Sequence, residues 1–194
     1  MNVLMIRHSQ TPGNREGRYI GRSDQPLAPE AMALAERLGG DPAVKTVYVT
    51  PLIRTRQTAA ILFPNARQIV VDALREMDFG DFEGKNAAEL EGDPAYRAWV
   101  DGGCLSPCPG GEGREGFSDR VCGGFLEVMA RAQGERAVFV VHGGTIMAVL
   151  ERFARPRQDF YAWHVENCQG WLCGWTADGR GRGLLTGCQP WGAQ

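Results

Sequence analysis

The sequence lacks several features that whole classes of function require. No run of Lys and Arg occurs among its 194 residues, and the formal net charge is −2. Nucleic-acid binding relies on clustered basic residues, so we expect no nucleic-acid partner. No apolar stretch approaches the ~20 residues of a membrane-spanning helix, and residues 3–6 are too short for a signal-peptide core. We therefore expect a cytoplasmic protein with no membrane partner.

The six cysteines lack the spacing of a metal site. No CxxC motif occurs, and no His lies near Cys104 and Cys108. Structural zinc is normally held by closely spaced pairs of Cys and His. Reduced thiols are also the rule in the cytoplasm. We therefore expect free thiols, no structural disulfide and no metal.

Short apolar segments alternate with helical patterns along the chain. Four of these segments are rich in β-branched residues and contain few polar ones, as in strands that are covered on both faces. They are residues 3–6, 46–49, 68–71 and 137–141.

Between these strands, apolar residues recur with the spacing of helices. The predicted helices are residues 29–38, 52–62 and 117–132, and a further helix that Gly143-Gly144 opens. A closing hairpin is expected from residues 171–175 and 183–186, with Asp178-Gly179 between them. The alternation predicts an α/β fold, a three-layer α/β/α arrangement around a mainly parallel central sheet. No linker or internal repeat interrupts residues 1–194, so we expect a single domain.

Two long segments do not fit this alternation. Residues 7–26 are expected to form a polar loop, and residues 101–113 are rich in Gly and Pro. Loops of such length in a compact domain commonly serve a function. Residues 101–113 are a candidate lid or specificity wall.

Polar side chains follow each predicted strand. Because ligands bind beyond the carboxyl ends of parallel strands, side chains at these positions are expected to meet at one edge of the sheet. The chain has only three histidines, and two of them stand at strand ends. The predicted cluster consists of Arg7, His8, Arg54, Glu76 and His142.

This set of side chains suits phosphoryl transfer. A neutral imidazole is a good nucleophile toward phosphorus. Arginine matches phosphate oxygens with two parallel hydrogen bonds, and can stabilise the transition state without a metal. A protonated carboxyl can give its proton to the leaving oxygen and then, as a carboxylate, activate water. The cluster therefore predicts a cofactor-independent enzyme for a small phosphorylated substrate.

The same residues stand in motifs that resemble those of the histidine phosphatase superfamily, the phosphoglycerate-mutase-like group. The family's Arg-His-Gly-Glu-Thr opening corresponds to Arg7–Thr11, followed by Asn14. Its Ser-Pro-Leu-x-Arg segment corresponds to Thr50–Arg54, its acid-donor segment to Leu74–Gly84, and its second-histidine segment to Val141–Gly144. The resemblance covers nearly the whole chain, with the motifs in the family's order.

The resemblance implies a role for each residue. His8 would be the phosphorylated nucleophile, Glu76 the proton donor, and Arg7, Arg54 and His142 the phosphate clamp. Asn14 and Gly143 would also contact the phosphate, and Arg18 is a weaker candidate. Glu83 also matches the pattern, and we interpret it as structural. The third histidine, His164, is expected to be a packing or surface residue.

One departure from the pattern concerns the residue after the nucleophile. Ser9 stands where the family usually has Gly, and Gln10 where it has Glu. A side chain at position 9 restricts the backbone, so the geometry of the phosphate loop could differ there.

Two features favour a hydrolase within the superfamily. Residues 111–121 resemble the corresponding segment of α-ribazole phosphatases of cobalamin biosynthesis. Only 65 residues lie between Glu76 and His142 (142 − 76 − 1), whereas phosphoglycerate mutases typically carry a longer insertion. The expected function is hydrolysis of a small phosphomonoester, with α-ribazole 5′-phosphate as the candidate substrate. A mutase-type isomerase and an inactive phospho-ligand-binding module remain alternatives, and the oligomeric state cannot be read from the sequence.

Overall fold

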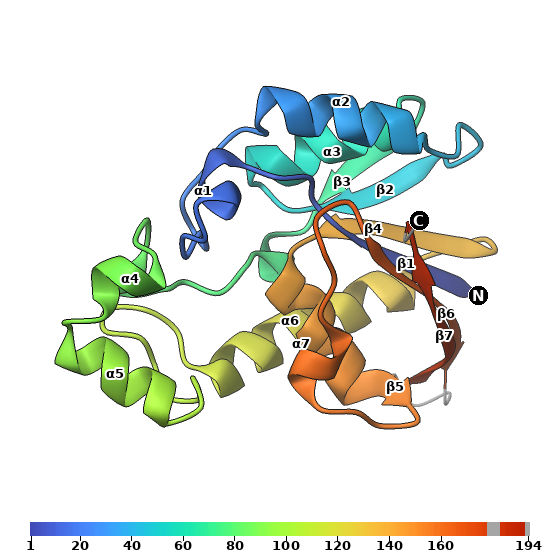
Figure 1. The fold of residues 1–194 in the computed structure, drawn as a ribbon. Coiled ribbons are helices and arrows are strands. Elements are labelled where there is room, and N and C mark those ends of the chain that lie inside the picture. The colour runs from blue at the N-terminus through green and yellow to red at the C-terminus, as the bar shows by residue number, and fades with distance from the viewer. Residues whose placement is uncertain (178–182, 193–194) are drawn as a thin grey trace.

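The fold is built on a seven-stranded sheet with the order β3-β2-β4-β1-β6-β7-β5 (Figure 1). The computed structural model describes residues 1–177 and 183–192. In chain order the strands are β1 (Asn2–Arg7), β2 (Thr46–Val49), β3 (Arg67–Val70), β4 (Arg136–Val141), β5 (Ala154–Arg155), β6 (Gly170–Ala177) and β7 (Gly183–Trp191). Neighbouring strands are parallel except where β6 pairs with β1 and β7. The predicted mainly parallel sheet is confirmed.

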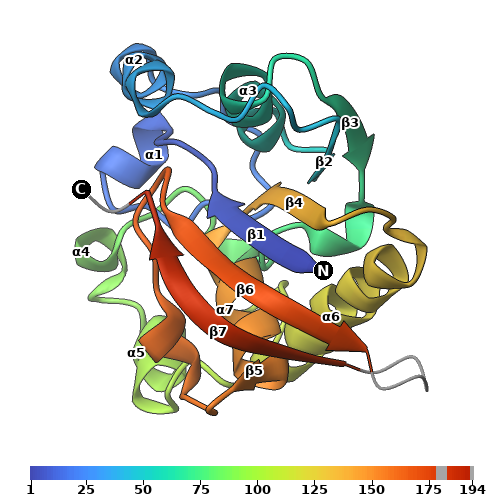
Figure 2. The same ribbon diagram turned by 90° about the vertical axis from the view of Figure 1, so that its right-hand side faces the viewer.

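Helices cover both faces of the sheet and complete the three layers (Figures 1 and 2). One face carries α2 (Pro29–Leu38) and α3 (Ile53–Leu62), and the other carries α6 (Arg114–Arg131) and α7 (Gly143–Phe153). The remaining α-helices are α1 (Pro12–Arg15), α4 (Ala87–Leu90) and α5 (Pro94–Asp101), and 3₁₀ turns lie at Asp72–Leu74, Gly80–Phe82 and Phe160–Trp163. No helix in the described ranges is both long and apolar enough to cross a membrane.

Alternate residues of the central strands face two separate cores. In β1, Val3 and Met5 pack with the core on the side of α6 and α7. Leu4 and Ile6 pack with the core on the side of α2 and α3. Both sets are apolar because both faces of the sheet are covered at this strand, which explains its uninterrupted apolar sequence.

The register of the central strands brings two sequence-distant histidines together. β1 and β4 are parallel, with Arg7 opposite Val141, so His8 and His142 follow the two strands at matching positions. The backbone N–H of His8 donates to the carbonyl of Val141 at 2.9 Å. β2 pairs with the other edge of β4 through Val49 and Val140. Three strand ends therefore meet at one edge of the sheet.

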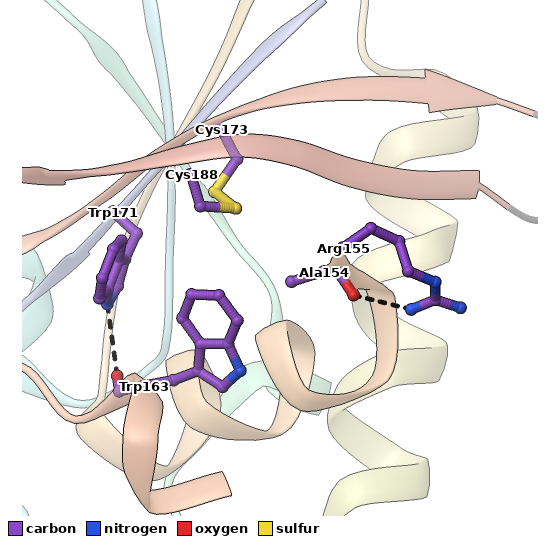
Figure 3. The surroundings of a disulfide bond; sticks show 6 residues. All are labelled: Ala154, Arg155, Trp163, Trp171, Cys173 and Cys188. Carbon is purple, nitrogen blue, oxygen red and sulfur yellow. Dashed lines mark hydrogen bonds between the residues drawn. A yellow bond between two sulfur atoms is a disulfide. The ribbon is translucent and has the colours of Figure 1, made fainter. Parts of the chain in front are cut away.

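The closing hairpin contains a disulfide, which corrects our expectation of free thiols. Cys173 in β6 and Cys188 in β7 are bonded, with their Cα atoms 4.2 Å apart (Figure 3). β7 continues to Trp191, beyond the predicted end at residue 186, after an irregularity in the pairing near Gly187, where φ is +59°. Because of this irregularity, alternation along the strands does not show that the two cysteines face each other. The other cysteines are free, and the predicted turn at Asp178-Gly179 lies outside the described residues.

Candidate active site

His8 is buried and oriented by its own backbone neighbour. Only 4% of the residue is exposed. Its Nδ1 lies 2.6 Å from the carbonyl oxygen of Ser9, and because a carbonyl only accepts, Nδ1 carries the proton. In the neutral ring Nε2 then holds a free lone pair. Burial lowers the pKa of His8 well below its ordinary 6.5, and the nearby Arg54 lowers it further. The neutral ring is therefore favoured at pH 7.

His142 lies beside His8 at the start of α7. It is fully buried, and the centroids of the two imidazole rings are 5.3 Å apart. Its Nε2 is 3.0 Å from Oγ1 of Thr50, which follows β2. Burial, followed by the charge of Arg54, lowers the pKa of His142 well below 6.5.

The two arginines are anchored through their terminal nitrogens. Nη1 of Arg7 donates to the carbonyl of Val165 at 2.8 Å. Arg54 is fully buried on α3, and its Nη1 and Nη2 donate to the carbonyls of Ser23 and Gly21 at 2.7 and 2.8 Å. These bonds fix both guanidinium groups against backbone rather than against carboxylates.

Buried nitrogen atoms of the cluster suit an anionic ligand. Nε of Arg7, Nε of Arg54 and Nδ1 of His142 are all buried and have no hydrogen-bond partner within the described chain. His142 also stands at the N-cap position of the eleven-residue helix α7, without a capping bond from its side chain, and the helix dipole favours negative charge there. A phosphate group can accept from the two arginine nitrogens, and also from Nδ1 of His142 in the tautomer whose Nε2 accepts from the Thr50 hydroxyl.

Glu76 approaches the same helix end from the other side. Its Oε1 accepts from the N–H of Met77 and its Oε2 from the N–H of Gly144, both at 3.0 Å. Burial raises the pKa of Glu76, although these N–H bonds and the two arginines act in the opposite direction. A Cβ on Gly144 would collide with Oε1 of Glu76, so only glycine allows this approach. The carboxyl group is thus held at the helix end with an enhanced tendency to stay protonated.

A cavity of about 360 Å³ opens onto this cluster. Of the residues predicted from the sequence, Arg7, His8, Asn14, Glu76 and Gly143 line it, whereas Arg54 and His142 are fully buried and do not. Asn14 also accepts the N–H of Thr11 at 3.1 Å as part of the cap of α1. The predicted residues therefore come together, some at the cavity surface and some behind it.

The outer wall of the cavity was not predicted from the sequence. It is mainly aromatic and is formed by Tyr19, Phe79, Trp99, Phe117, Phe160 and Tyr161. These residues come from separate segments and share no motif, so only the fold brings them together. The exposed His164 also lines the cavity, although no ligand role was predicted for it.

Two further arginines on the wall are already paired with carboxylates. Arg18 contacts Glu89 at 2.7 Å. Arg114 contacts Glu151 at 3.0 Å, and its guanidinium carbon lies 3.3 Å from the ring centroid of Phe160. Their charges are thus largely neutralised within the protein, which weakens the case for Arg18 as a phosphate ligand.

Ser9 fits the loop without backbone strain. Its hydroxyl donates to the carbonyl of Ala31 at 2.9 Å, and its N–H donates to Oγ1 of Thr58 at 2.9 Å. Within the described ranges, the non-glycine residues with positive φ are Cys104 and Cys168, and Ser9 is not among them. The loop therefore accommodates Ser9 in place of the family's Gly, with its hydroxyl hydrogen-bonded.

Glu83 ties the loop before α2 to the acid segment. Its Oε1 accepts from the N–H groups of Gly21, Arg22 and Phe79 at 3.0, 2.8 and 3.3 Å. Its Oε2 accepts from the hydroxyl of Ser23 at 2.7 Å. The carbonyls of the same loop hold Arg54, so Glu83 supports the site from outside the cavity, in line with its structural interpretation.

The sequence matches a known family over most of its length. A sequence model described as "Histidine phosphatase superfamily (branch 1)" matches residues 3–182. The chain belongs to this superfamily.

Relatives within the superfamily carry names of both phosphatases and mutases. A metal-independent phosphoserine phosphatase of Arabidopsis thaliana is 30% identical over 164 residues, which are 79% of this chain and 68% of the relative. The crystal structure of an α-ribazole phosphatase from Shigella flexneri has a TM-score of 0.83 at 22% identity, covering 100% of this chain and 96% of the other. A phosphoglycerate mutase structure from Thermus thermophilus has a TM-score of 0.68 at 30% identity, covering 95% and 96%. These likenesses bear out the phosphoglycerate-mutase-like fold and support phosphatase chemistry.

Proposed function

We propose that this protein is a phosphomonoesterase that works through a phosphohistidine intermediate on His8. The observation that carries the proposal is the setting of His8, which is buried with Nδ1–H bound to the Ser9 carbonyl, while burial lowers its pKa and so favours the neutral ring. This arrangement leaves Nε2 free to attack, beside nitrogen donors that suit phosphate. The nucleophile therefore needs no separate base to activate it.

In the first step, Nε2 of His8 forms a bond to phosphorus while the ester P–O bond breaks. Glu76 gives its proton to the departing oxygen, and the substrate leaves as an alcohol. Arg7, at the cavity surface, and Arg54 and His142, which lie buried behind it, would donate to the equatorial oxygens of the transferring group, where negative charge is spread in the transition state. For Arg54 and His142 this requires a small shift of the side chains toward the cavity. Asn14 and Gly143 lie at the cavity surface where they can contact the same group.

In the second step, water attacks phosphorus and the N–P bond breaks. Glu76, now a carboxylate, takes the proton from water and is ready for the next cycle. Phosphate leaves and His8 returns to its neutral form, so atoms and protons balance over the two steps. The buried position of Glu76 raises its pKa and favours the protonated form that the first step needs.

The wall of the cavity favours a substrate whose leaving group carries a planar, uncharged ring system. Its aromatic residues offer faces for stacking. A phosphoserine or phosphoglycerate would instead place a carboxylate near the wall, where Arg18 and Arg114 already pair with acidic side chains. We therefore propose α-ribazole 5′-phosphate, in cobalamin biosynthesis, as the substrate. The name of the similar Shigella flexneri structure is consistent with this choice.

A mutase remains the second candidate because one 30% identical structure is titled a phosphoglycerate mutase. A mutase would return the phosphoryl group to a second oxygen of the substrate rather than to water. The mutase hypothesis predicts that the protein isomerises a phosphoglycerate and that a bisphosphorylated primer stimulates this reaction. Absence of primed isomerisation, together with rapid release of phosphate, would remove this candidate.

The test combines a substrate panel with trapping of the intermediate. The panel contains α-ribazole 5′-phosphate, phosphoserine, phosphoglycerates, sugar phosphates and nucleotides. We expect the highest kcat/KM for α-ribazole 5′-phosphate, and a trapped phosphoprotein that is labile in acid but stable in base. His8→Ala should lose the label and His164→Ala should keep it. Full phosphatase activity in His8→Ala would refute the mechanism. Binding of phosphate esters by the wild-type protein without turnover would instead favour an inactive phospho-ligand-binding module.

The proposal includes one catalytic domain in the cytoplasm. The Cys173–Cys188 pair makes the location testable, since glutathione keeps most cytosolic thiols reduced. Fractionation of cells combined with rapid alkylation would report both the compartment and the state of this pair. Recovery of the protein outside the cytoplasm would overturn the proposed location.

A further inference from the structure

One arginine outside the cavity holds the backbone that carries Glu76. Arg120 lies on α6, and its Nη1 donates to the carbonyls of Ala73 and Arg75 at 2.9 and 3.1 Å. Its Nη2 donates to the carbonyl of Glu76 at 3.3 Å. A single guanidinium therefore binds three carbonyls within four residues of chain.

Arg120 is fixed in turn by Glu112. Nε and Nη2 of Arg120 donate to the two carboxylate oxygens of Glu112 at 2.8 and 2.6 Å, a geometry that restricts the rotation of both side chains. Glu112 also bonds Asp78 twice, since its Oε2 accepts from the N–H of Asp78 at 3.0 Å and its own N–H donates to the Asp78 carbonyl at 2.9 Å. The pair thus holds the chain on both sides of Glu76.

The acid segment depends on these contacts because it has no regular structure of its own. Residues 75–79 lie between two 3₁₀ turns and belong to no helix or strand. The carboxyl of Glu76 is held by two N–H groups, and one of them, from Met77, belongs to the same segment. A shift of the segment would therefore carry the carboxyl and one of its donors together, away from Gly144 on α7.

We propose that Arg120 and Glu112 are positioning residues for the proton donor. They set the distance between the Glu76 carboxyl and the leaving oxygen by holding the backbone of residues 73–78 against α6. Neither residue lines the cavity, so both act through Glu76 rather than on the substrate. This inference rests on the proposed function, in which Glu76 protonates the leaving group.

The test uses two aryl phosphates of nearly the same shape. The leaving group of 4-nitrophenyl phosphate departs readily as an anion, whereas that of phenyl phosphate needs a proton in the transition state. The readout is the ratio of kcat/KM for the two substrates in one enzyme preparation. This ratio reports the phosphorylation step and does not change with the fraction of folded protein.

We expect Arg120→Met to lower kcat/KM for phenyl phosphate roughly tenfold to hundredfold, since small misplacements of a catalytic group have effects of this size. The value for 4-nitrophenyl phosphate should fall much less. Glu112→Gln should change the ratio in the same direction, and Arg120→Lys should restore part of it. Arg152→Met is the matched control because Arg152 is an exposed arginine whose ion pair is with Asp119 and not with the acid segment.

Glu76→Gln separates the two possible failures. It should raise the selectivity for 4-nitrophenyl phosphate more than any other variant. If Glu76→Gln leaves the ratio unchanged, Glu76 is not the proton donor, and that step of the proposed function is wrong. If Glu76→Gln shifts the ratio but Arg120→Met and Glu112→Gln do not, only the positioning role is refuted. Should Arg120→Met fail to fold, Arg120→Lys and Glu112→Gln decide the question by the same ratio.

Discussion

At the scale of single residues, the site depends on two groups whose burial favours the uncharged form. Burial lowers the pKa of His8 below 6.5 and raises that of Glu76 above 4.5. Desolvation disfavours the charged form in both cases. His8 therefore loses its proton more easily, and Glu76 keeps its proton to a higher pH. The proposed mechanism needs neutral His8 and protonated Glu76 at the same pH, and burial of both widens the range in which they coexist.

The first prediction concerns the pH dependence of kcat/KM. Protonation of His8 should limit activity on the acid side, at a pH below 6.5. Ionisation of Glu76 should limit it on the alkaline side, at a pH above 4.5. After correction for titration of the substrate phosphate, we expect a bell-shaped profile that loses its alkaline limb in Glu76→Gln. An alkaline limb that persists unchanged in this variant would exclude Glu76 as the titrating acid.

The second prediction concerns the close contact between Gly144 and Glu76. Gly144→Ala places a methyl group against the carboxyl oxygen, so Glu76 must move and lose the N–H bond from α7. We expect kcat to fall about a hundredfold, the effect of a misplacement of about 1 Å. Gly116→Ala on α6 is the control, because a Cβ there meets nothing within 4 Å. Equal activity of the two variants would contradict the tight fit at Gly144.

At the scale of elements, irregular segments support the site as much as strands do. The sequence shows where the strands end, so it places Arg7, His8, Arg54, Glu76 and His142 at one edge of the sheet. It does not show that residues 108–112 dock onto residues 78–81. The N–H of Asp81 donates to the Pro109 carbonyl at 2.8 Å, and Gly80, with φ +53°, leaves no room there for a side chain. Such backbone contacts between two loops leave no periodic signal in the sequence.

These contacts also bear on the interpretation of residues 101–113. The part from Cys108 onward is bound to the acid segment, whereas Cys104 lines the cavity and Leu105 is 60% exposed. The segment therefore combines an anchored base with an exposed tip. Replacing residues 102–106 should change the ratio of the KM values for substrates of different size. An unchanged ratio would argue against a specificity wall.

The third prediction tests the support that Glu83 gives to Arg54. Glu83→Ala removes the acceptor for the N–H groups of Gly21, Arg22 and Phe79. We expect a loss of about 1 kcal/mol in the free energy of unfolding, the low end of the cost of unsatisfied donors, because these N–H groups are partly buried or exposed. KM should also rise because the loop that anchors Arg54 loosens. Glu127→Ala, at an exposed position on α6, should change neither quantity. An unaltered KM in Glu83→Ala would confine the role of Glu83 to stability.

At the scale of the whole molecule, the sequence predicted the central strands and a mainly parallel sheet, but neither the order of the strands nor the pairings between them. The four helices that cover the central strands follow from periodicity, whereas the shorter α1, α4 and α5 were not predicted, and α1 lies within the expected polar loop of residues 7–26. The disulfide between Cys173 and Cys188 depends on a register irregularity near Gly187. Alternation along one strand carries no information about which residue of the next strand lies opposite. The aromatic wall of the cavity was not predicted either, because its residues come from separate segments that only the fold brings together.

The fourth prediction is a count of thiols. Alkylation of the unfolded, unreduced protein should modify four cysteines, and prior reduction should raise the count to six. Replacing both Cys173 and Cys188 with Ser should lower the stability of the oxidised protein by about 3 kcal/mol, as estimated for a loop of about 15 residues. Cys104→Ser, outside the hairpin, is the control. Six modified cysteines without reduction would show that the bond is absent in the isolated protein.

The parallel pairing of β1 with β4 determines when the protein can first become active. His8 and His142 are adjacent because these strands, separated by most of the chain, align with Arg7 opposite Val141. A one-residue slip would turn the side chains of one strand to the opposite face. During synthesis, the nucleophile is made among the first residues but must wait for residue 142 before its pocket exists. The onset of activity in refolding should therefore coincide with formation of this long-range pairing, which is intrinsically slow, rather than with the earlier appearance of helices.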